Sequence, residues 1–213
     1  MHAIQRFDAI VVAGGRGSRL GGIDKPALRI GELTLVERAV AAVAAARRVS
    51  VVRQVDDVAI DERVSRTVEQ PPWSGPASAI AAGLADLATP VRSRRSNRRI
   101  RERRFVAVLA ADLPRVGEAF AALRRHRPRR DSDALIAVDA DGRDQPLLAL
   151  YRTAALRSAV AAAPTEGLSM FRLIAGLAVT RVPLDAELCA DIDVEADALA
   201  AGIVLHRVGD VDD

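Results

Sequence analysis

Short apolar runs alternate with longer Ala-rich segments along most of the chain. Continuous apolar runs are typical of buried strands, whereas apolar positions three and four residues apart are typical of helices. The pattern predicts strands at residues 8–13, 49–52, 66–70, 105–114, 134–142, 146–151 and 177–183. It predicts helices at residues 33–48, 74–88, 116–126, 153–163 and 168–175, and a terminal helix within residues 190–202.

Two of these helices carry recognisable start signals. Thr34 is followed three residues later by Glu37, which is the spacing of a capping box at a helix N-terminus. Pro76 stands near the first turn of the helix at 74–88, where its missing N–H costs nothing.

Strands that alternate with helices at this spacing indicate an open, mostly parallel α/β sheet with helices on both faces. The 213 residues are enough for one domain with a substantial core. Ligands of such sheets bind outside the carboxyl ends of the strands. Three polar features fall at predicted strand ends: residues 14–25, Asp112, and the pair Asp191 and Asp193. We therefore expect them to contribute to one site.

The composition constrains the core and the compartment. Half of the residues are hydrophobic, but only six are aromatic, so the core must consist mainly of Ala, Val, Leu and Ile. Cys189 is the only cysteine, so no internal disulfide can form and we expect a cytoplasmic protein. No signal-like segment precedes Asp8, and no apolar run approaches the roughly 20 residues of a membrane helix, so we expect no membrane partner.

The net charge of +3 comes from one segment, residues 92–104, which holds eight arginines and one glutamate. Without the +7 of this segment, the rest of the chain carries −4. We interpret it as a flexible, solvated insertion between a helix and the strand that ends on Asp112. A second interpretation is a docking site for a polyanionic acceptor or RNA. No aromatic residue is interleaved to stack on bases, which argues against nucleic acid as a partner.

The glycine-rich segment after the first strand fits neither of two well-known phosphate-binding motifs. Leu20 stands where the dinucleotide motif G-x-G-x-x-G needs its last glycine. A P-loop needs Gly-Lys-Ser/Thr, but Lys25 lies between Asp24 and Pro26. The proline also biases the backbone before it toward extended conformations and away from the helix that follows a P-loop.

The same segment nevertheless suits a polyphosphate. Gly14 and Gly15 let main-chain N–H groups approach an anion closely, and Arg16 and Arg19 add positive charge. Lys25 is the only lysine among 31 basic residues, which favours a position that needs a compact ammonium group. The alternative interpretation is an ordinary surface turn between a strand and a helix.

These residues carry a resemblance to a known family. The segment VVAGGRGSRLGGIDKPALRIG resembles the signature loop of the MobA-like nucleotidyltransferases, L-A-G-G-x-x-x-R-M-G-G-x-D-K. In the same order along the chain, GPASAIAAGL resembles the family's G-P-L-A-G-I-x-x-G-L, AADLPRV its C-D-x-P, DGRDQPLLALYR its D-G-x-x-H-P-x-x-A-L-Y, and DIDVEADAL its N-x-N-T-P-E-E-L. The molybdenum cofactor guanylyltransferases are the members that the chain resembles most. The resemblance implies a single-domain, Rossmann-like three-layer fold of the nucleotide-diphospho-sugar transferase type.

The resemblance also implies an activity. A nucleoside monophosphate, most commonly from GTP, would pass to the phosphate of molybdopterin with release of pyrophosphate, and molybdoenzymes would be transient partners. Lys25, Arg19 and Asp112 would be catalytic, with Lys25 stabilising charge on the α-phosphoryl group. The positions that match the family's nucleotide-binding residues are Val12, Ala13, Gly14, Gly15, Arg16, Lys25, Arg53, Gln70 and Asp112.

The acidic residues at two strand ends suit a magnesium ion. Asp112 follows a largely apolar run, and Mg²⁺ needs few carboxylates because phosphates and water supply its other oxygens. Asp191 and Asp193 are two residues apart, so on an extended segment they face the same side and could share the cation. Asp193 could instead cap the helix that starts near Val194.

Several departures from the family's pattern leave the substrates open. Gln70 replaces an aspartate and offers guanine one amide oxygen, and Gln145 replaces a histidine. Arg53 lies near the position where the family often has an asparagine that contacts the nucleotide. A molybdenum cofactor cytidylyltransferase and a cobinamide-phosphate guanylyltransferase are therefore alternatives. A non-catalytic protein that binds a nucleotide, a cofactor or a molybdoenzyme is an alternative of another class, and an RNA-binding protein that works through residues 92–104 is a third.

Overall fold

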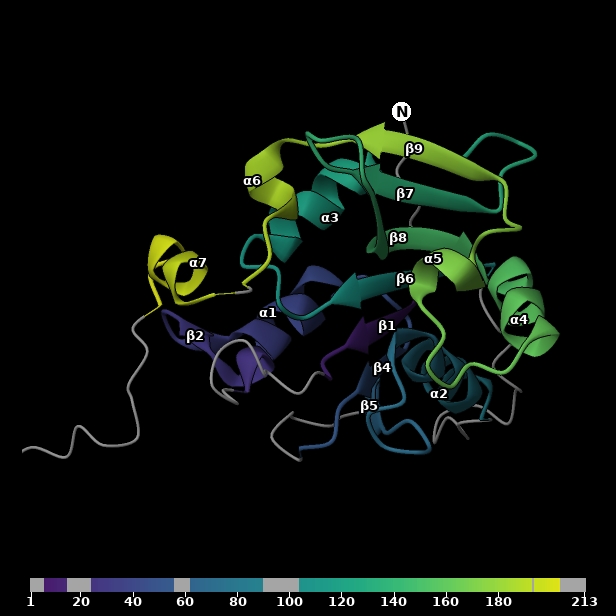
Figure 1. Ribbon diagram of the computed structural model, residues 1–213, viewed down its shortest axis with the longest axis horizontal. Coiled ribbons are helices and arrows are strands. Elements are labelled where there is room, and N and C mark those ends of the chain that lie inside the picture. Colours follow the sequence, from purple (N-terminus) through teal and green to yellow (C-terminus); the bar gives the residue numbers. More distant parts are fainter. Residues whose placement is uncertain (1–5, 15–23, 56–61, 90–103, 193, 204–213) are drawn as a thin grey trace, which may run out of the picture.

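The computed structural model describes residues 6–14, 24–55, 62–89, 104–192 and 194–203. Within these residues, one central sheet has the strand order β5-β4-β1-β6-β8-β7-β9 (Figure 1). Its strands are β1 (Asp8–Val12), β4 (Val49–Val52), β5 (Val64–Thr67), β6 (Phe105–Ala110), β7 (Ala134–Val138), β8 (Asp144–Arg152) and β9 (Val179–Pro183). Only β8 runs antiparallel to its neighbours β6 and β7. The predicted mostly parallel sheet is therefore confirmed.

Helices cover both faces of the sheet, which gives three layers (Figure 1). One face carries α1 (Leu35–Ala42), α3 (Val116–Arg124) and α6 (Ala186–Cys189); the other carries α2 (Pro76–Ala88), α4 (Thr153–Ala162) and α5 (Met170–Leu173). Alternate residues of a strand point to opposite faces. Accordingly, Ala9 and Val11 of β1 belong to the first apolar layer and Ile10 to the second.

Smaller elements gather beside the carboxyl end of β1. They are the 3-10 turn η2 (Lys25–Ala27), the hairpin strands β2 (Arg29–Ile30) and β3 (Leu33–Thr34), and the C-terminal helix α7 (Glu195–Ala200). A third apolar cluster joins them, in which Leu28 and Ile30 pack against Leu35, Ile192 and Ala198. This cluster holds the segment around Ile192 next to the segment that contains Lys25.

The predicted cap of α1 is confirmed, but the helix is much shorter than expected. Thr34 Oγ1 accepts a hydrogen bond from the Glu37 N–H at 3.2 Å, and the Glu37 carboxylate accepts one from the Thr34 N–H at 2.7 Å. The helix ends at Ala42 rather than at residue 48. The chain must return to β4 by Val49, and it does so through tight turns anchored by the Arg47 N–H on the Phe7 carbonyl oxygen at 3.0 Å.

Other boundaries also differ from the predictions. Backbone before Pro26 was expected to be extended, but a single 3-10 turn begins at Lys25, and only Asp24, with ψ 87°, lies outside it. Strand β6 ends at Ala110, so Asp112 lies in the turn that follows the strand. Helix α5 has only four residues, and α6 was not predicted because four residues carry too little periodicity. Within the described residues, no helix has the length and apolarity needed to cross a membrane.

Candidate functional site

The carboxyl end of β1 lies between two parallel neighbours, as a ligand site in an open α/β sheet requires. The Ala13 N–H donates to the Val52 carbonyl oxygen at 3.0 Å, and the Ala111 N–H donates to the Val12 carbonyl oxygen at 2.9 Å. Ala13 is buried, and Gly14 directly after it is exposed. The first residues of the glycine-rich segment therefore emerge from the middle of the sheet at its carboxyl edge.

Asp112 and the acidic segment near the C-terminus meet at this edge. The Ile192 N–H donates to the Asp112 carbonyl oxygen at 3.1 Å, which places Asp191 beside the turn after β6. The guanidinium of Arg38 donates to the Pro114 carbonyl oxygen at 3.1 and 3.2 Å and so anchors the same turn to α1. The expected convergence of Asp112 with the segment around Asp191 is thus present in the backbone.

The types of side chain at this position suit a magnesium site. Asp112 is half-buried and Asp191 exposed, and carboxylate oxygens on adjacent segments are donors that Mg²⁺ prefers. Among the described residues, no three His, Cys, Asp or Glu side chains cluster as metal ligands. Asp193, the third predicted ligand, lies outside the described residues, and the same holds for Gly15, Arg16, Arg19 and residues 92–103.

Lys25 starts the 3-10 turn η2 and is half-buried. The turn is fixed to the start of α1, because the Leu35 N–H donates to the Leu28 carbonyl oxygen at 2.8 Å. Buried Pro26 anchors the turn from inside. The backbone at Lys25 is thus held in place by contacts with the protein, although the lysine belongs to a glycine-rich region.

Arg53 follows β4 and is almost completely buried, with 1% of its surface exposed. Its Nη1 donates to the Ala13 carbonyl oxygen at 3.2 Å and to Asp24 Oδ1 at 3.1 Å, and its Nη2 donates to Asp24 Oδ2 at 2.6 Å. Ala13 and Asp24 stand on either side of residues 14–23. The described contacts of Arg53 are therefore within the protein, and its predicted contact with a nucleotide stays a prediction.

A cavity of about 240 Å³ opens beside Gly14. Its lining comes from the end of β1, the segment before α2, the first turns of α2 and strand β8: Val12, Gly14, Glu69, Trp73, Gly75, Pro76, Ala79 and Leu147. Glu69 is 5% exposed, and its Oε1 accepts a hydrogen bond from the Trp73 N–H at 3.2 Å. Gln70, the predicted nucleotide contact, is exposed and does not line the cavity.

Sequence reasoning missed Glu69 and Trp73. The sequence predicts a strand at residues 66–70 that includes Glu69, but the observed strand β5 ends at Thr67, and residues 71–75 have no apolar period, so neither side chain was assigned to the site. Two signals were nevertheless available. Trp73 is the only tryptophan of the chain and directly precedes the SGP start of a helix, and Glu69 is an acidic residue four positions before it.

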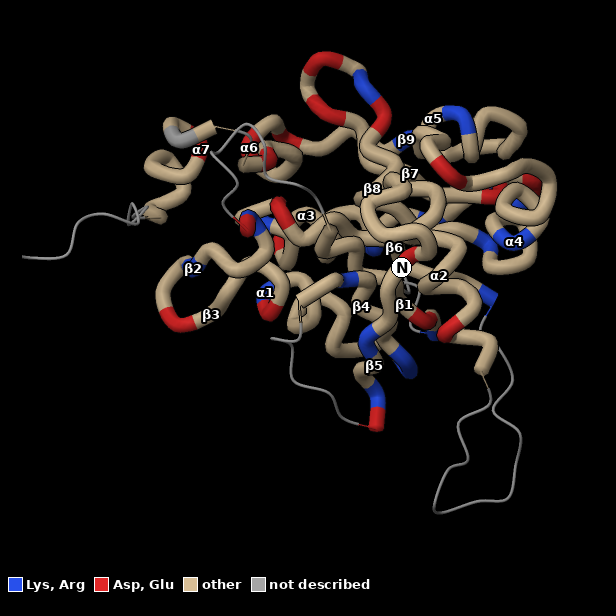
Figure 2. The backbone as a smooth tube through the Cα atoms, turned by 60° about the horizontal axis from the view of Figure 1, so that its bottom comes forward, with Lys and Arg blue, Asp and Glu red and all other residues tan. Residues whose placement is uncertain are grey.

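A charged loop connects β7 and β8 at the carboxyl end of β7 (Figure 2). The Asp139 carboxylate accepts hydrogen bonds from the backbone N–H groups of Arg143 and Asp141, at 2.9 and 3.0 Å, and from Gln145 Nε2 at 2.9 Å. These bonds lower the pKa of Asp139, and the bond from the Arg143 N–H has the largest effect. Gln145 thus contributes one of the three hydrogen bonds that fix the Asp139 carboxylate in this loop.

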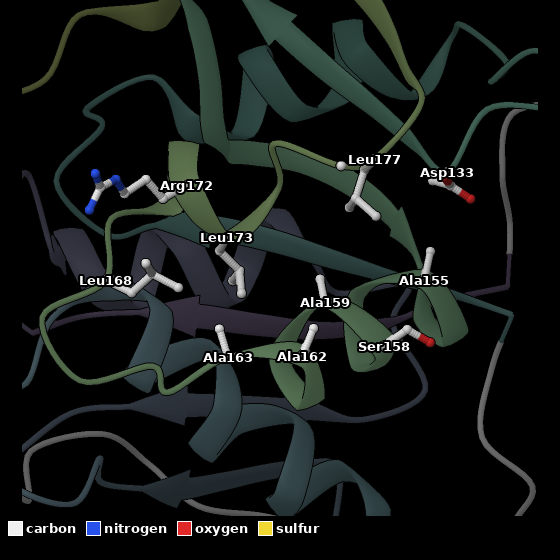
Figure 3. A pocket seen from close by; sticks show the side chains of 11 residues that line it. Asp133, Ala155, Ser158, Ala159, Ala162, Ala163, Leu168, Arg172, Leu173 and Leu177 are labelled. Carbon is white, nitrogen blue, oxygen red and sulfur yellow. The ribbon is translucent and has the colours of Figure 1, made fainter.

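A larger cavity of about 540 Å³ lies elsewhere, between α4 and α5 (Figure 3). Small and apolar side chains line most of it, among them Ala159, Leu168 and Leu173, with Arg172 and Asp133 at its margins (Figure 3). Asp133 precedes β7, whereas Leu168 at the other end of the cavity lies close to Gly75, which lines the cavity beside Gly14. None of the predicted site residues lines it.

Comparison with known proteins agrees with this arrangement. A family model described as the MobA-like NTP transferase domain matches residues 9–179. No curated protein matches the chain.

Several solved structures share the fold at low sequence identity. Molybdopterin-guanine dinucleotide biosynthesis protein A from Archaeoglobus fulgidus is 18% identical, with a TM-score of 0.59 over 92% of this chain and 96% of that one. The inositol-1-phosphate CTP transferase of T. maritima is 14% identical, with a TM-score of 0.64 over 94% and 96%. The 2-C-methyl-D-erythritol 4-phosphate cytidylyltransferase of Thermus thermophilus is 22% identical, with a TM-score of 0.57 over 92% and 97%. The fold is therefore shared by proteins whose names specify different nucleotides and acceptors.

Proposed function

Because the chain belongs to the MobA-like NTP transferase domain family of nucleotidyltransferases, we propose that it is a Mg²⁺-dependent guanylyltransferase. GTP would donate its guanosine monophosphate to the phosphate of molybdopterin, and pyrophosphate would be released. The observation that carries the proposal is the meeting of Gly14, Lys25, Asp112 and the segment around Asp191 at the carboxyl edge of the sheet.

The reaction needs little covalent chemistry from the protein. An oxygen of the acceptor phosphate attacks the α-phosphorus in line, and the bond from that phosphorus to the bridging oxygen breaks as pyrophosphate leaves. Catalysis then consists of positioning and charge stabilisation. Main-chain N–H groups at Gly14 would hold phosphate oxygens, and the Lys25 ammonium would stabilise charge that develops on the α-phosphoryl group and on pyrophosphate.

Asp112 would hold Mg²⁺, with Asp191 and Asp193 as further carboxylates, and the ion would neutralise phosphate charge. Arg19 would contribute further positive charge. The residues themselves would position the triphosphate.

The choice of GTP and molybdopterin rests on the similarity of the chain's motifs to the guanylyltransferases and on the A. fulgidus neighbour. Two other neighbours are named for CTP or for cytidylyl transfer, so the nucleotide must be tested directly. The test incubates the chain with Mg²⁺, α-labelled GTP and molybdopterin, and follows labelled dinucleotide and pyrophosphate. Parallel reactions use CTP with molybdopterin, and GTP with cobinamide phosphate.

Each result selects one function. Guanylylated molybdopterin as the preferred product supports the proposal. A product from CTP alone identifies a cytidylyltransferase, and a product only with cobinamide phosphate identifies that guanylyltransferase. Nucleotide binding without pyrophosphate release for any acceptor would identify a non-catalytic binding protein.

A further inference from the structure

We propose that Glu69 selects guanine among the nucleobases and that the Trp73 ring lies against the bound base. This inference rests on the proposed function, because it assigns the base-binding part of the same site. The cavity that these two residues line also contains Val12 and Gly14. A nucleotide held by its phosphates at Gly14 would therefore have the cavity directly beside it.

The Glu69 carboxylate is close to the glycine that begins the phosphate-binding segment. A Cβ atom at Gly14 would lie 3.9 Å from Glu69 Oε1, which is ordinary van der Waals contact. Glu69 thus stands against the backbone at the end of β1. It is held there by the segment that leads into α2, whose first residues line the same cavity.

Glu69 is a buried acid with few partners. It is 5% exposed, and its only hydrogen-bond partner in the described residues is the Trp73 N–H. No arginine or lysine of the described chain forms an ion pair with it. A carboxylate offers about four acceptor positions, so one donor leaves most of those of Glu69 open to a ligand. Such a group at a cavity wall suits a ligand that brings its own N–H donors.

Guanine is the base that matches this acceptor. Its N1–H and its 2-amino group are two adjacent donors on one edge, which a carboxylate can bind together. The corresponding edge of adenine or cytosine presents one amino donor next to a ring-nitrogen acceptor, and that of uracil one N–H between two carbonyl oxygens. Each of those bases would place an acceptor against the carboxylate, which a buried charge disfavours.

The backbone conformation and the exposure of Trp73 suit a residue that contacts a ligand. Its φ of 63° is rare for a bulky residue and costs conformational energy, and the bond from its N–H to Glu69 helps to hold that conformation. The residue is nevertheless 43% exposed, and it lines the cavity. Flat aromatic faces stack on nucleobases, so a partly exposed indole here is suited to cover one face of guanine.

The test uses the fluorescence of this single tryptophan in the full chain. With Mg²⁺ and no acceptor, dissociation constants are measured for GTP, ITP, XTP, ATP and CTP, and isothermal titration calorimetry checks each value. ITP lacks the 2-amino group, and XTP carries an oxygen in its place. For the wild type we expect GTP to quench Trp73 and to bind about 10- to 100-fold more tightly than ITP, as a hydrogen bond to a charged group provides.

The decisive variant is Glu69→Gln, which keeps an oxygen to accept the Trp73 N–H. The amide of the variant would accept a hydrogen bond from the purine N1–H and donate one to the XTP oxygen. We therefore expect the affinity for GTP to fall about 10- to 100-fold and the affinity for XTP to rise. Glu166→Gln is the matched control, because Glu166 is an exposed glutamate outside the cavity. It should leave the GTP preference unchanged.

The outcomes separate this inference from the function on which it rests. Equal affinity for all five triphosphates, or an unchanged GTP preference in Glu69→Gln, would overturn the role of Glu69 and leave nucleotidyl transfer standing. If no triphosphate binds at all, the proposed function falls and the inference falls with it. A change of the preferred triphosphate from GTP in the wild type to XTP in Glu69→Gln supports the role of Glu69, whatever the acceptor substrate of the enzyme is.

Discussion

The guanidinium of Arg53 and the carboxylate of Asp24 form a two-bond ion pair, with Nη2 to Oδ2 at 2.6 Å and Nη1 to Oδ1 at 3.1 Å. Arg53 is 1% exposed and also donates to the Ala13 carbonyl oxygen. Because Asp24 directly precedes Lys25, this pair fixes the backbone from which the lysine extends. Arg53 is thus a candidate positioning residue for Lys25.

We predict that Arg53→Lys lowers kcat by about 10- to 100-fold and changes the KM for GTP little, because a point charge cannot form the paired bonds that fix Asp24. Steady-state kinetics of nucleotidyl transfer measure kcat and the KM for GTP separately. Asp24→Asn should lower kcat in the same direction, since it loses the charge of the pair. A loss that appears entirely in the KM for GTP would instead indicate that Arg53 contacts the nucleotide.

Arg48 provides the matched control for this experiment. It is 7% exposed, and its guanidinium donates to the carbonyl oxygens of Leu87, Thr89 and Asp86, remote from Lys25. Arg48→Lys should cost stability in thermal unfolding but leave kcat of the folded enzyme unchanged. Equal losses of kcat in the Arg48 and Arg53 variants would show that Arg53 acts only on stability.

Asp112→Asn should raise the Mg²⁺ concentration for half-maximal activity and lower kcat by about 10- to 100-fold, because the amide keeps the shape but loses the charge. Asp191→Asn should shift the Mg²⁺ dependence in the same direction. Asp185→Asn, an exposed aspartate at the start of α6 with no side-chain cap bond, is the control and should behave like the wild type. The metal assignment is wrong if magnesium titrations of the Asp112 variant and the wild type superimpose.

Gly83 of α2 lets the helix approach β1 closely. A Cβ atom there would come within 2.7 Å of Ile10 Cγ2, and Ile10 is fully buried. Gly83→Ala should therefore lower the free energy of unfolding by about 1–3 kcal/mol, the usual cost of overpacking. Gly117→Ala on α3 meets no atom within 4 Å and should raise that free energy by up to about 1 kcal/mol. Urea denaturation followed by circular dichroism measures both, and a Gly83→Ala variant as stable as Gly117→Ala would refute the packing argument.

Burial raises the pKa of the Cys189 thiol, and the negative charge of Asp139 raises it further. At pH 8 the native protein therefore holds less thiolate than a free cysteine does. We predict that a disulfide reagent labels native Cys189 about ten-fold or more slowly than the urea-unfolded chain, because thiolate is the reactive form. Asp139→Asn removes the charge, lowers the pKa and should speed native labelling. Equal rates for native and unfolded protein would contradict this prediction.

The sequence predicted the sheet and the meeting of its polar strand ends for a physical reason. Apolar runs such as residues 8–12 and 105–110 are long enough to mark buried strands, and parallel strands bring their carboxyl ends to one edge. Thr34 and Glu37 could be read because a capping box is a local interaction. The expected proximity of Asp112 to the segment around Asp191 followed from the same topology.

The remaining features depend on contacts that a local pattern does not encode. The early end of α1 depends on the Arg47 N–H reaching the Phe7 carbonyl oxygen, and the ion pair that fixes Asp24 depends on Arg53, which follows β4. Glu69 belongs to a predicted strand whose observed counterpart ends at Thr67, and Trp73 lies on a segment with no apolar period, so only the fold places them beside Gly14. The short helices α5 and α6 contain about one turn each, too few residues for periodicity to define their ends.

The central claim is that Lys25 and Asp112 carry out nucleotidyl transfer at the end of β1. Its most direct measurement is the initial rate of labelled dinucleotide formation from α-labelled GTP and molybdopterin with Mg²⁺, for the wild type, Lys25→Ala and Asp112→Ala. Loss of one transition-state charge contact costs about 100- to 1,000-fold in kcat, so we predict losses of that size in both variants, with the fold retained by circular dichroism. Wild-type turnover in both variants would contradict the account.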